Sequence, residues 1–305
     1  MTAMPQVSII TPILNAASFL DEAIASVAAQ TYSDWELLLC DDGSTDASVA
    51  IARRHMASHP RKIKYLEHPG HVTRGSSAAR NLGLHNARGR FIALLDADDV
   101  WLPNKLDEQV PLLERHSDAG MLYGDTLRWF SWTGNPDDAH RDFQLPLGVP
   151  LDQLSNPPDL LTRYLDRRAE VACTCSILAR RDIVGRVGGF EESFRGMYDD
   201  QAFYAKMILA APVYVSGRLW DKYRIHPGSM CARAEQSEEL GRAQRQYLEW
   251  LERYVTAHQC RGTSVWRALQ AEKWRARHPV LTRIDRAIRI RLGLVSRPRR
   301  QLRLS

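Results

Sequence analysis

The sequence has no apolar run that approaches the roughly 20 residues needed to cross a bilayer. It is also poor in cysteine, and its five cysteines complete neither a zinc site nor a disulfide framework: 40, 173, 175, 231 and 260. The first strand pattern begins at Val7, so we expect no signal peptide. These absences favour a reduced, cytoplasmic compartment.

Two common nucleotide-binding signatures are absent as well. No G-x-G-x-x-G follows the first predicted strand, which disfavours a dinucleotide-binding fold. No G-x-x-x-x-G-K-[ST] occurs in the chain, which excludes a P-loop. A phosphate-bearing ligand would therefore have to be held by other residues.

Positive charge is concentrated at the end of the chain. Residues 283–305 hold eight arginines and one aspartate, a charge of +7, so the remaining 282 residues carry −2 of the total of +5. A nucleic-acid partner for the whole protein is therefore not supported. The segment 280–304 interleaves leucine, isoleucine and valine with arginine. That pattern suits either a basic amphipathic helix on an anionic membrane or a helix packed on the rest of the protein.

Strand and helix patterns alternate through the first hundred residues. Strand patterns at 7–12, 35–42, 63–68 and 91–96 are separated by helix patterns from Ser18, at 46–58 and at 75–87. This alternation predicts an α/β fold with a mostly parallel central sheet flanked by helices. The second half is less regular, with a strand at 119–126, a surface loop at 133–160, a strand leading into a helix at 173–181, a helix at 200–210, an extended segment at 213–226 and helices beyond 231.

Acidic residues follow the fourth predicted strand, at the edge where open α/β sheets bind ligands. The strand runs directly into Asp96, Asp98 and Asp99. Carboxylates two residues apart can both turn toward one hard cation, such as Mg²⁺ or Mn²⁺. The alternative is a helix cap, which needs only one carboxylate and so accounts poorly for three.

Two further segments add polar groups at the same edge. Asp41 and Asp42 end the second strand and could accept hydrogen bonds from a nucleobase or a ribose, although Asp-Gly is also turn chemistry. The segment TRGSSAARNLG (73–83) opens a helix, whose N-terminus suits phosphate, with Arg80 and Asn81 as donors. A solvated helix face is the alternative for this segment. Together the segments predict a site for a phosphate-bearing nucleotide and a divalent cation.

Three ordered segments resemble the family 2 glycosyltransferases, which have the GT-A fold: VSIITPILNAASFLDEAIASVAAQTYSDWELLLCDDGSTD, GSSAARNLG and FIALLDADDVWLPNKLDEQ. The resemblance covers about residues 5–230 and is densest through 5–110. It implies a Rossmann-like GT-A domain at 1–230, with a nucleotide-sugar-binding half at 1–105 and an acceptor half at 106–230. A helical extension with a basic tail follows at 231–305.

The resemblance also implies roles for individual residues. Asp98 is the expected metal ligand, with Asp99 and His226 as further ligands. Asp200 is the expected general base, as the second residue of a pair that is usually Glu-Asp in the family and is Asp199-Asp200 here. The expected donor-binding residues are Thr11, Pro12, Asn15, Asp41, Asp42, Arg80, Asn81, Asp96, Ala97 and Asp98.

The activity implied by the resemblance is inverting transfer of a hexosyl or N-acetylhexosaminyl group from a nucleotide diphosphate sugar, with a UDP-sugar favoured and Mg²⁺ or Mn²⁺ as cofactor. The implied acceptor is a hydroxyl of a saccharide or a lipid-linked molecule, in cell-envelope polysaccharide or glycoconjugate synthesis. Peripheral contact with the inner face of the cell membrane would suit such an acceptor.

Two other functions are alternatives to sugar transfer. A nucleotidyltransferase would need a glycine-rich, basic loop after the first strand, and residues 9–20 contain neither glycine nor arginine. A non-catalytic sugar-nucleotide-binding module is disfavoured because both Asp98 and Asp200 are present. The aromatic residues Trp129, Phe130 and Trp132 could stack on an acceptor sugar or serve as core or surface cover.

Overall fold

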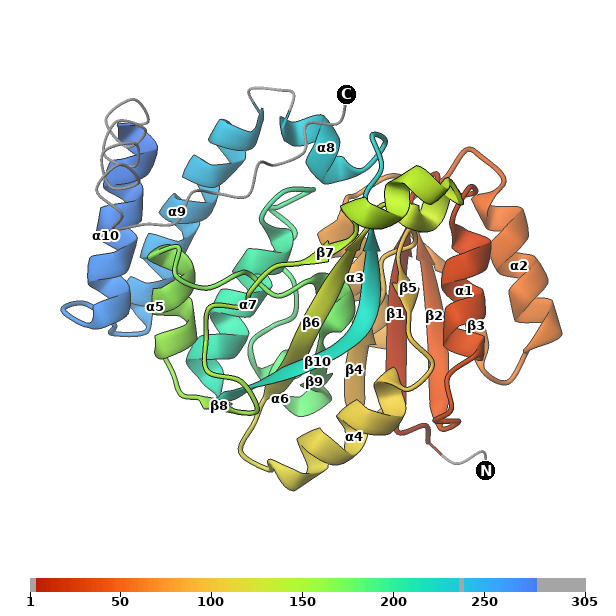
Figure 1. Cartoon of the computed structure of the whole chain (residues 1–305), viewed down its shortest axis with the longest axis horizontal. Coiled ribbons are helices and arrows are strands. Elements are labelled where there is room, and N and C mark those ends of the chain that lie inside the picture. Colours follow the sequence, from red (N-terminus) through yellow and green to blue (C-terminus); the bar gives the residue numbers. More distant parts are fainter. Residues whose placement is uncertain (1–3, 236–238, 279–305) are drawn as a thin grey trace. The chain divides into compact units, whose positions relative to one another are not determined.

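The computed structural model describes residues 4–235 and 239–278 of the chain (Figure 1). The chain divides into two compact units, residues 1–225 and residues 226–305. From the sequence we placed this boundary at 230/231, which is five residues after the division between 225 and 226. The arginine-rich segment 283–305 lies outside the described residues, so both alternatives for it stay predictions.

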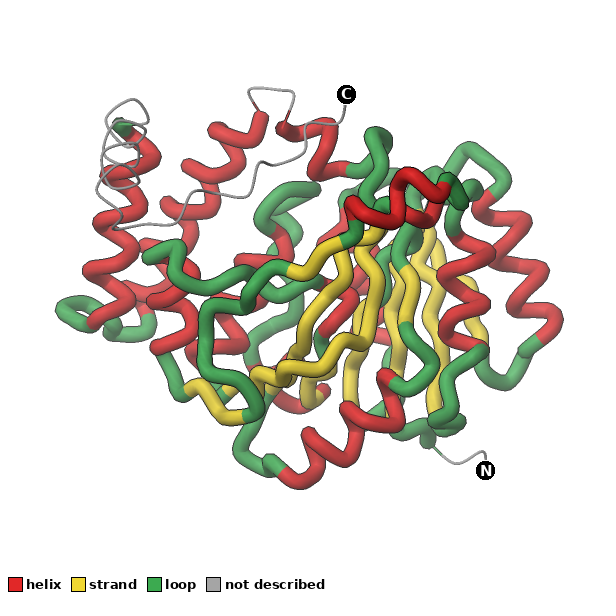
Figure 2. Tube along the Cα trace, in the orientation of Figure 1, coloured by secondary structure: helices red, strands yellow, loops and turns green. Residues whose placement is uncertain are grey.

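A mixed sheet forms the centre of the first unit (Figure 2). Its main path runs β3-β2-β1-β4-β9-β6-β10-β5, with β7 beside β6 and β8 beside β10. The strands are β1 (Val7–Ile13), β2 (Trp35–Asp41), β3 (Ile63–Glu67), β4 (Phe91–Leu94), β5 (Val100–Trp101), β6 (Met121–Trp129), β7 (Phe143–Gln144), β8 (Gln153–Ser155), β9 (Leu178–Arg180) and β10 (Val213–Arg224). Neighbouring pairs among β3, β2, β1 and β4 are parallel, and β9 runs antiparallel to β4 and β6.

Helices cover both faces of this sheet, as the alternating pattern predicted. The helices of the first unit are α1 (Leu20–Ala28), α2 (Ser48–Ser58), α3 (Ser76–Asn86), α4 (Lys105–Arg115), α5 (Asp159–Leu165), α6 (Arg181–Arg186) and α7 (Asp199–Ala210). Ile9 of β1 belongs to the core cluster that α1 and α4 complete, while its neighbour Ile10 faces α3. A Cβ on Gly83 of α3 would lie 2.5 Å from Cγ2 of Ile10, so glycine is what lets this helix pack so closely.

The second unit is helical over its described part. It contains α8 (Met230–Glu235), α9 (Glu239–Ala257) and α10 (Ser264–Arg277), with the break between α9 and α10 at 260–263 that the sequence indicated. Leu251 and Val255 of α9 and Leu269 of α10 are fully buried. Among the described residues, no helix is both long enough and apolar enough to span a membrane.

Two segments differ from the pattern-based expectation. The fourth strand ends at Leu94 rather than continuing to residue 96, because the chain turns there and Asp99 N–H donates to the carbonyl of Asp96 at 3.1 Å. The expected loop at 133–160 contains a 3₁₀ helix at Pro136–Arg141 and two short strands. The two short strands, β7 and β8, form because they pair with β6 and β10, which are distant in the sequence. The local composition of 133–160 therefore gave no sign of them.

Candidate active site

The carboxyl ends of β1, β2 and β4 lie at one edge of the sheet, because these strands are parallel and adjacent. The turn 95–99 follows β4 at this edge, and α3 and α7 begin beside it. The acidic residues predicted from the sequence therefore do meet in space. They differ in burial: Asp41, Asp42, Asp99 and Asp199 are buried, whereas Asp96, Asp98 and Asp200 are partly exposed to solvent.

Arg80 of α3 joins two acidic segments that are far apart in the sequence. Its Nη2 donates to Oδ1 of Asp96 at 2.7 Å, and its Nη1 donates to Oδ2 of Asp199 at 2.5 Å. The Arg80 residue is only 5% exposed. Burial alone would lower the pKa of Arg80, but Asp96 and Asp199 outweigh it and raise the pKa above its ordinary value. Arg80 therefore serves here as a fixed counter-ion for the acidic edge.

Asp99, which we expected as a further metal ligand, is buried and hydrogen-bonded within the protein. Its Oδ1 accepts the backbone N–H of Arg224 at 2.8 Å, and its Oδ2 accepts the thiol of Cys175 at 2.9 Å. The residue is 1% exposed. Burial, followed by the charge of Asp98, raises its pKa well above the ordinary value. Both oxygens of Asp99 thus make hydrogen bonds inside the protein, and these bonds hold the acidic turn in place. The role of Asp99 as a metal ligand stays a prediction.

Arg224, at the end of β10, supports the same turn and was not singled out from the sequence. Its Nε donates to the carbonyl of Asp98 at 2.7 Å, and its Nη2 donates to Glu22 at 2.6 Å. Its guanidinium also lies over the rings of Phe19, Trp129 and Trp132, at 4.9, 4.5 and 5.2 Å from their centroids. A lone arginine that ends a long strand is the only sequence signal that could have pointed to it.

The aromatic cluster of the sequence analysis therefore has a structural use. Trp129 and Trp132 cover the guanidinium of Arg224, and Trp132 Nε1 donates to the carbonyl of Ile225 at 2.8 Å. Phe130 stacks with Phe143, with 6.3 Å between their ring centroids. These contacts favour the reading of the cluster as cover, and stacking on an acceptor sugar stays a prediction.

Replacing Arg224 should cost stability. Arg224→Leu removes two charge-assisted hydrogen bonds and three cation–π contacts from a side chain that is 2% exposed, so we expect a loss of about 3 kcal/mol. The matched variant Glu22→Gln removes only the half-exposed partner and should cost less than about 1 kcal/mol. Urea unfolding of both variants measures the difference. Equal losses would mean that the bond to the acidic turn contributes nothing.

Asp200 lies in the first turn of α7, next to the buried and fully used Asp199. Asp199 accepts Ser76 Oγ at 2.6 Å as well as Arg80, which ties the start of α7 to α3. Asp200 is half-buried, and its Oδ1 accepts the N–H of Gln201 at 2.7 Å. Within the described residues its Oδ2 has no hydrogen-bond partner. Burial, then the charge of Asp199, raises the pKa of Asp200 to about 7.

The predicted base-reading pair brings together the loops of this edge. Both oxygens of Asp42 accept backbone N–H groups at 2.8 Å, from Arg74 and from Gly75. Asp41 accepts the N–H groups of Gly43 and Ser44 through Oδ2, while its buried Oδ1 has no hydrogen-bond partner among residues 4–235 and 239–278. Each carboxylate oxygen can accept a second hydrogen bond, so the pair keeps capacity for a ligand.

The other residues predicted to bind the donor sugar nucleotide differ in burial and in hydrogen bonding. Thr11 is buried, and its hydroxyl has no hydrogen-bond partner in the part of the chain that the structure describes. Pro12 is half-buried, and Ala97 is 6% exposed. Asn15 has a left-handed backbone (φ 51°), and its Oδ1 accepts the N–H of Thr45 at 2.8 Å. Asn15 therefore joins the loops that follow β1 and β2.

The expected roles of Asn81 in donor binding and of His226 in metal binding stay predictions. The Asn81 amide donates to the carbonyl of Phe190 at 3.0 Å and accepts the N–H of the same residue at 2.9 Å. It also donates to Glu192 at 3.1 Å, so its polar atoms hold the segment 190–192 rather than facing the acidic edge. His226 is the first residue of the second unit, and its role as a metal ligand stays a prediction.

Three groups of side chains near this edge could be considered for a cation. One of them is Asp41, Glu67 and His71, whose ligand atoms lie within 4.8 Å of one another. Asp99, Cys173 and Cys175 place one ligand atom each within 4.8 Å of one another, but two thiols suit soft ions rather than Mg²⁺ or Mn²⁺. Asp96 and Asp98 offer oxygens only. Asp96 has a side chain that is 27% exposed, and its Oδ2 has no partner in the described part of the chain. Asp96 and Asp98 offer oxygen ligands alone, which is the chemistry that a hard divalent cation prefers.

The sheet, with an acidic turn after β4 and a second acidic pair at the start of α7, defines a GT-A glycosyltransferase fold. The model of the family described as "Glycosyl transferase family 2" matches residues 8–188, and the chain belongs to this family. The family and the fold class predicted from the sequence are therefore confirmed.

Two bacterial glycosyltransferases are similar to this chain in sequence. The chain is 32% identical to a putative teichuronic acid biosynthesis glycosyltransferase, TuaG, of Bacillus subtilis over 185 residues, which is 60% of this chain and 65% of the relative. It is 40% identical over 119 residues to the Escherichia coli enzyme WfgD, a UDP-Glc:alpha-D-GlcNAc-diphosphoundecaprenol beta-1,3-glucosyltransferase, which is 39% of this chain and 45% of the relative. The chain thus matches less than two thirds of the length of either relative.

Two solved structures share the fold. TarS (residues 1–349) of S. aureus in complex with UDP-GlcNAc superposes with a TM-score of 0.60 at 19% identity, over 80% of this chain and 64% of TarS. The mannosyltransferase PcManGT of Pyrobaculum calidifontis, in complex with GDP-Man and Mn²⁺, gives a TM-score of 0.58 at 17% identity, over 95% and 81%. At these identities the likeness establishes the fold.

Proposed function

We propose that this protein is an inverting glycosyltransferase that uses Asp200 as its general base. The observation that carries the proposal is the state of Asp200, a half-buried carboxylate with one unpaired oxygen and a pKa raised to about 7 by burial and by Asp199. A base with a pKa near the working pH combines a useful deprotonated fraction with a strong driving force for proton transfer. Asp199 is buried and paired with Arg80, so it is not available for that role.

The proposed reaction is a single displacement. The acceptor hydroxyl attacks the anomeric carbon of the donor sugar while Asp200 takes its proton, and the nucleoside diphosphate leaves from the opposite face. One displacement at the anomeric carbon inverts its configuration. An NMR spectrum of the fresh product should therefore show the opposite anomer to the donor, and retention would contradict the mechanism.

The donor is proposed to lie along the edge formed by β1, β2 and β4. Asp42 and Asp41 would accept hydrogen bonds from the base, and Asp96 with Ala97 and Asp98 would contact the ribose and diphosphate, as predicted. A divalent cation, held by Asp98 with Asp96, would when bound stabilise the negative charge on the departing diphosphate. Asp99 and Arg224 keep this turn in position, and Arg80 offsets the charge of Asp96.

The pH dependence of the rate follows from the raised pKa of Asp200. The base must be deprotonated, so kcat/KM should fall about tenfold per pH unit below pH 7 and level off above it. Replacing Asp199 by Asn removes the nearest negative charge, so the acid limb of the profile should move to lower pH. A rate that is flat between pH 5.5 and 8 would contradict the assignment of the base.

A UDP-sugar is the proposed donor and a cell-envelope saccharide or lipid-linked acceptor the proposed acceptor. Support comes from the relatives: WfgD is named for UDP-Glc and a diphosphoundecaprenol acceptor, and TarS was solved with UDP-GlcNAc. A thermal-shift panel of UDP-, GDP-, CDP- and dTDP-sugars with Mn²⁺ tests the base. The UDP-sugars should give the largest increase in melting temperature, and an equal or larger shift with another base would refute this choice.

A further inference from the structure

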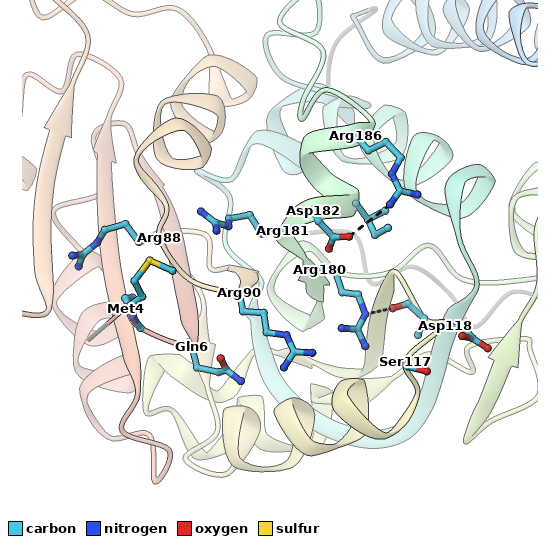
Figure 3. A pocket seen from close by; sticks show the side chains of 13 residues that line it. Met4, Gln6, Arg88, Arg90, Ser117, Asp118, Arg180, Arg181, Asp182 and Arg186 are labelled. Carbon is cyan, nitrogen blue, oxygen red and sulfur yellow. Dashed lines mark hydrogen bonds and ion pairs between the residues drawn. The ribbon is translucent and has the colours of Figure 1, made fainter. Parts of the chain in front are cut away.

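A hollow lies at the opposite edge of the sheet from the acidic site. It has a volume of about 1090 Å³ and is bounded by the segment before β1, the loops before β4 and β6, and the start of α6. Because β1 and β4 run away from this edge toward the acidic turn, the sheet separates the two sites. Figure 3 shows the arginines that surround the hollow, which belong to two segments, 88–90 and 180–186: Arg88, Arg90, Arg180, Arg181 and Arg186.

The acidic side chains of the hollow do not balance this charge. Five arginines line it against two aspartates, Asp118 and Asp182. Asp182 pairs only loosely, at 3.7 Å from Arg186. Arg88 is neutralised by a buried glutamate, Glu36, with hydrogen bonds of 2.9 and 2.7 Å. The remaining arginines still leave a surplus of positive charge around the hollow.

Three of these arginines keep donors that the protein does not use. Arg181 donates through Nη1 to the carbonyl of Ala87 at 3.0 Å, and its other guanidinium nitrogens have no partner among the described residues. Arg180 donates through Nε and Nη2 to backbone carbonyls, which leaves its Nη1 without a partner there. Arg90 has one long contact of 3.3 Å, to the exposed Glu114.

Arg90 and Arg180 also repel each other. Both guanidiniums lie over the ring of Phe91, at 5.2 and 5.6 Å from its centroid. Burial first, and then the charge of Arg90, lowers the pKa of Arg180 from its ordinary value. The Arg90 side chain is 56% exposed, so solvent screens part of this repulsion, and a bound anion would reduce it further.

We propose that this hollow binds a phosphate-bearing anion through Arg90, Arg180 and Arg181. Guanidinium groups match phosphate oxygens with paired hydrogen bonds, and three of them from two segments can surround a phosphate or diphosphate group. The ligand could be a free diphosphate or the phosphate of a lipid headgroup, which share this chemistry. The inference concerns a different edge of the sheet and does not rest on the proposed transfer reaction.

The first arm of the test is calorimetric titration of the full-length protein with inorganic pyrophosphate, in EDTA so that no metal–diphosphate complex forms at the acidic edge. We expect saturable binding, weakened at least about tenfold in Arg90→Gln/Arg181→Gln. The control Arg53→Gln/Arg61→Gln removes the same charge from exposed positions elsewhere and should bind within about twofold of wild type. Saturable binding that is equal in both double variants, or absent from wild type, would overturn the proposal.

The second arm separates the two sources of phosphate. Wild type and both double variants are sedimented with neutral phosphatidylcholine vesicles and with vesicles containing phosphatidylglycerol. If pelleting with the anionic vesicles falls only in Arg90→Gln/Arg181→Gln, the ligand is a lipid headgroup. If pelleting is the same for all three proteins while the pyrophosphate effect holds, the ligand is a soluble phosphate compound. All three proteins keep the segment 283–305, so its own contribution cancels.

Discussion

Asp200→Asn should abolish sugar transfer while leaving nucleotide binding intact. An asparagine amide keeps the size of the side chain and can still accept the N–H of Gln201, but it cannot take a proton from the acceptor hydroxyl. Loss of a positioned general base typically costs about 10²- to 10⁴-fold, and we expect a fall in kcat in that range. The measurement is a steady-state assay with the best donor of the thermal-shift panel, together with calorimetric binding of that donor.

The control for this variant is Asp159→Asn. Asp159 is also an aspartate in the first turn of a helix, α5, but it is exposed and lies outside the acidic edge. It should transfer sugar at the wild-type rate. If Asp200→Asn turned over as fast as Asp159→Asn, another residue would have to be the base.

Asp98→Ala should have its largest effect on binding rather than on the chemical step. Removing a carboxylate that holds a divalent cation should weaken donor binding in Mn²⁺ at least about 100-fold. In EDTA, wild type and variant should bind the nucleotide with similar, low affinity, since the lost contribution belongs to the cation. Calorimetry with and without Mn²⁺ makes this comparison directly.

Two further variants serve as controls for Asp98→Ala: one at an exposed aspartate elsewhere and one at the neighbouring Asp99. Asp107→Ala removes an exposed carboxylate from α4 and should not change binding. Asp99→Asn should lower stability, because it alters a residue bonded to Arg224 and Cys175, yet it should retain more of the Mn²⁺ effect than Asp98→Ala. If Asp99→Asn lost the Mn²⁺ effect as completely as Asp98→Ala, the cation would have to be reassigned to Asp99.

The sequence predicted the first half of the fold well because its signals are local. The strands β1, β2 and β4 are short, mostly apolar runs, and each of β1, β2 and β3 is followed by a helix that begins near a serine or glycine, as at Gly75 before α3. The acidic edge followed from one rule, that ligands bind at the carboxyl ends of parallel strands. Periodicity and turn chemistry were therefore enough to bring Asp41, Asp42, Asp96 and Asp98 to the same edge.

What the sequence did not reveal depends on contacts between distant segments. Arg224 meets Asp98 and Asp99 across about 125 residues, and nothing near Arg224 in the chain marks it as a partner of an acidic turn. The thiol of Cys175 reaches Asp99 in the same way. Because those contacts decide which carboxylate of 96–99 is accessible, the sequence could place the trio but could not separate Asp98 from Asp99.

The same limit applies to the arginine-lined hollow. Arg90 and Arg181 are separated by 91 positions, and the short arginine pairs to which they belong, 88/90 and 180/181, give no sign in the sequence that they meet. Only the antiparallel pairing of β4 with β9, which aligns Phe91 with Arg180, brings the two segments together. The distribution of charge along the sequence pointed instead to the eight arginines at 283–303.

A crystal of the protein grown with manganese and its preferred sugar nucleotide tests the central claim most directly. Anomalous scattering should place the metal against the carboxylates that follow β4, with Asp98 as a ligand, and Oδ2 of Asp200 should face the anomeric carbon from the side opposite the diphosphate. A metal bound instead between Asp99 and the two thiols, or a donor whose anomeric carbon is out of reach of Asp200, would contradict this account.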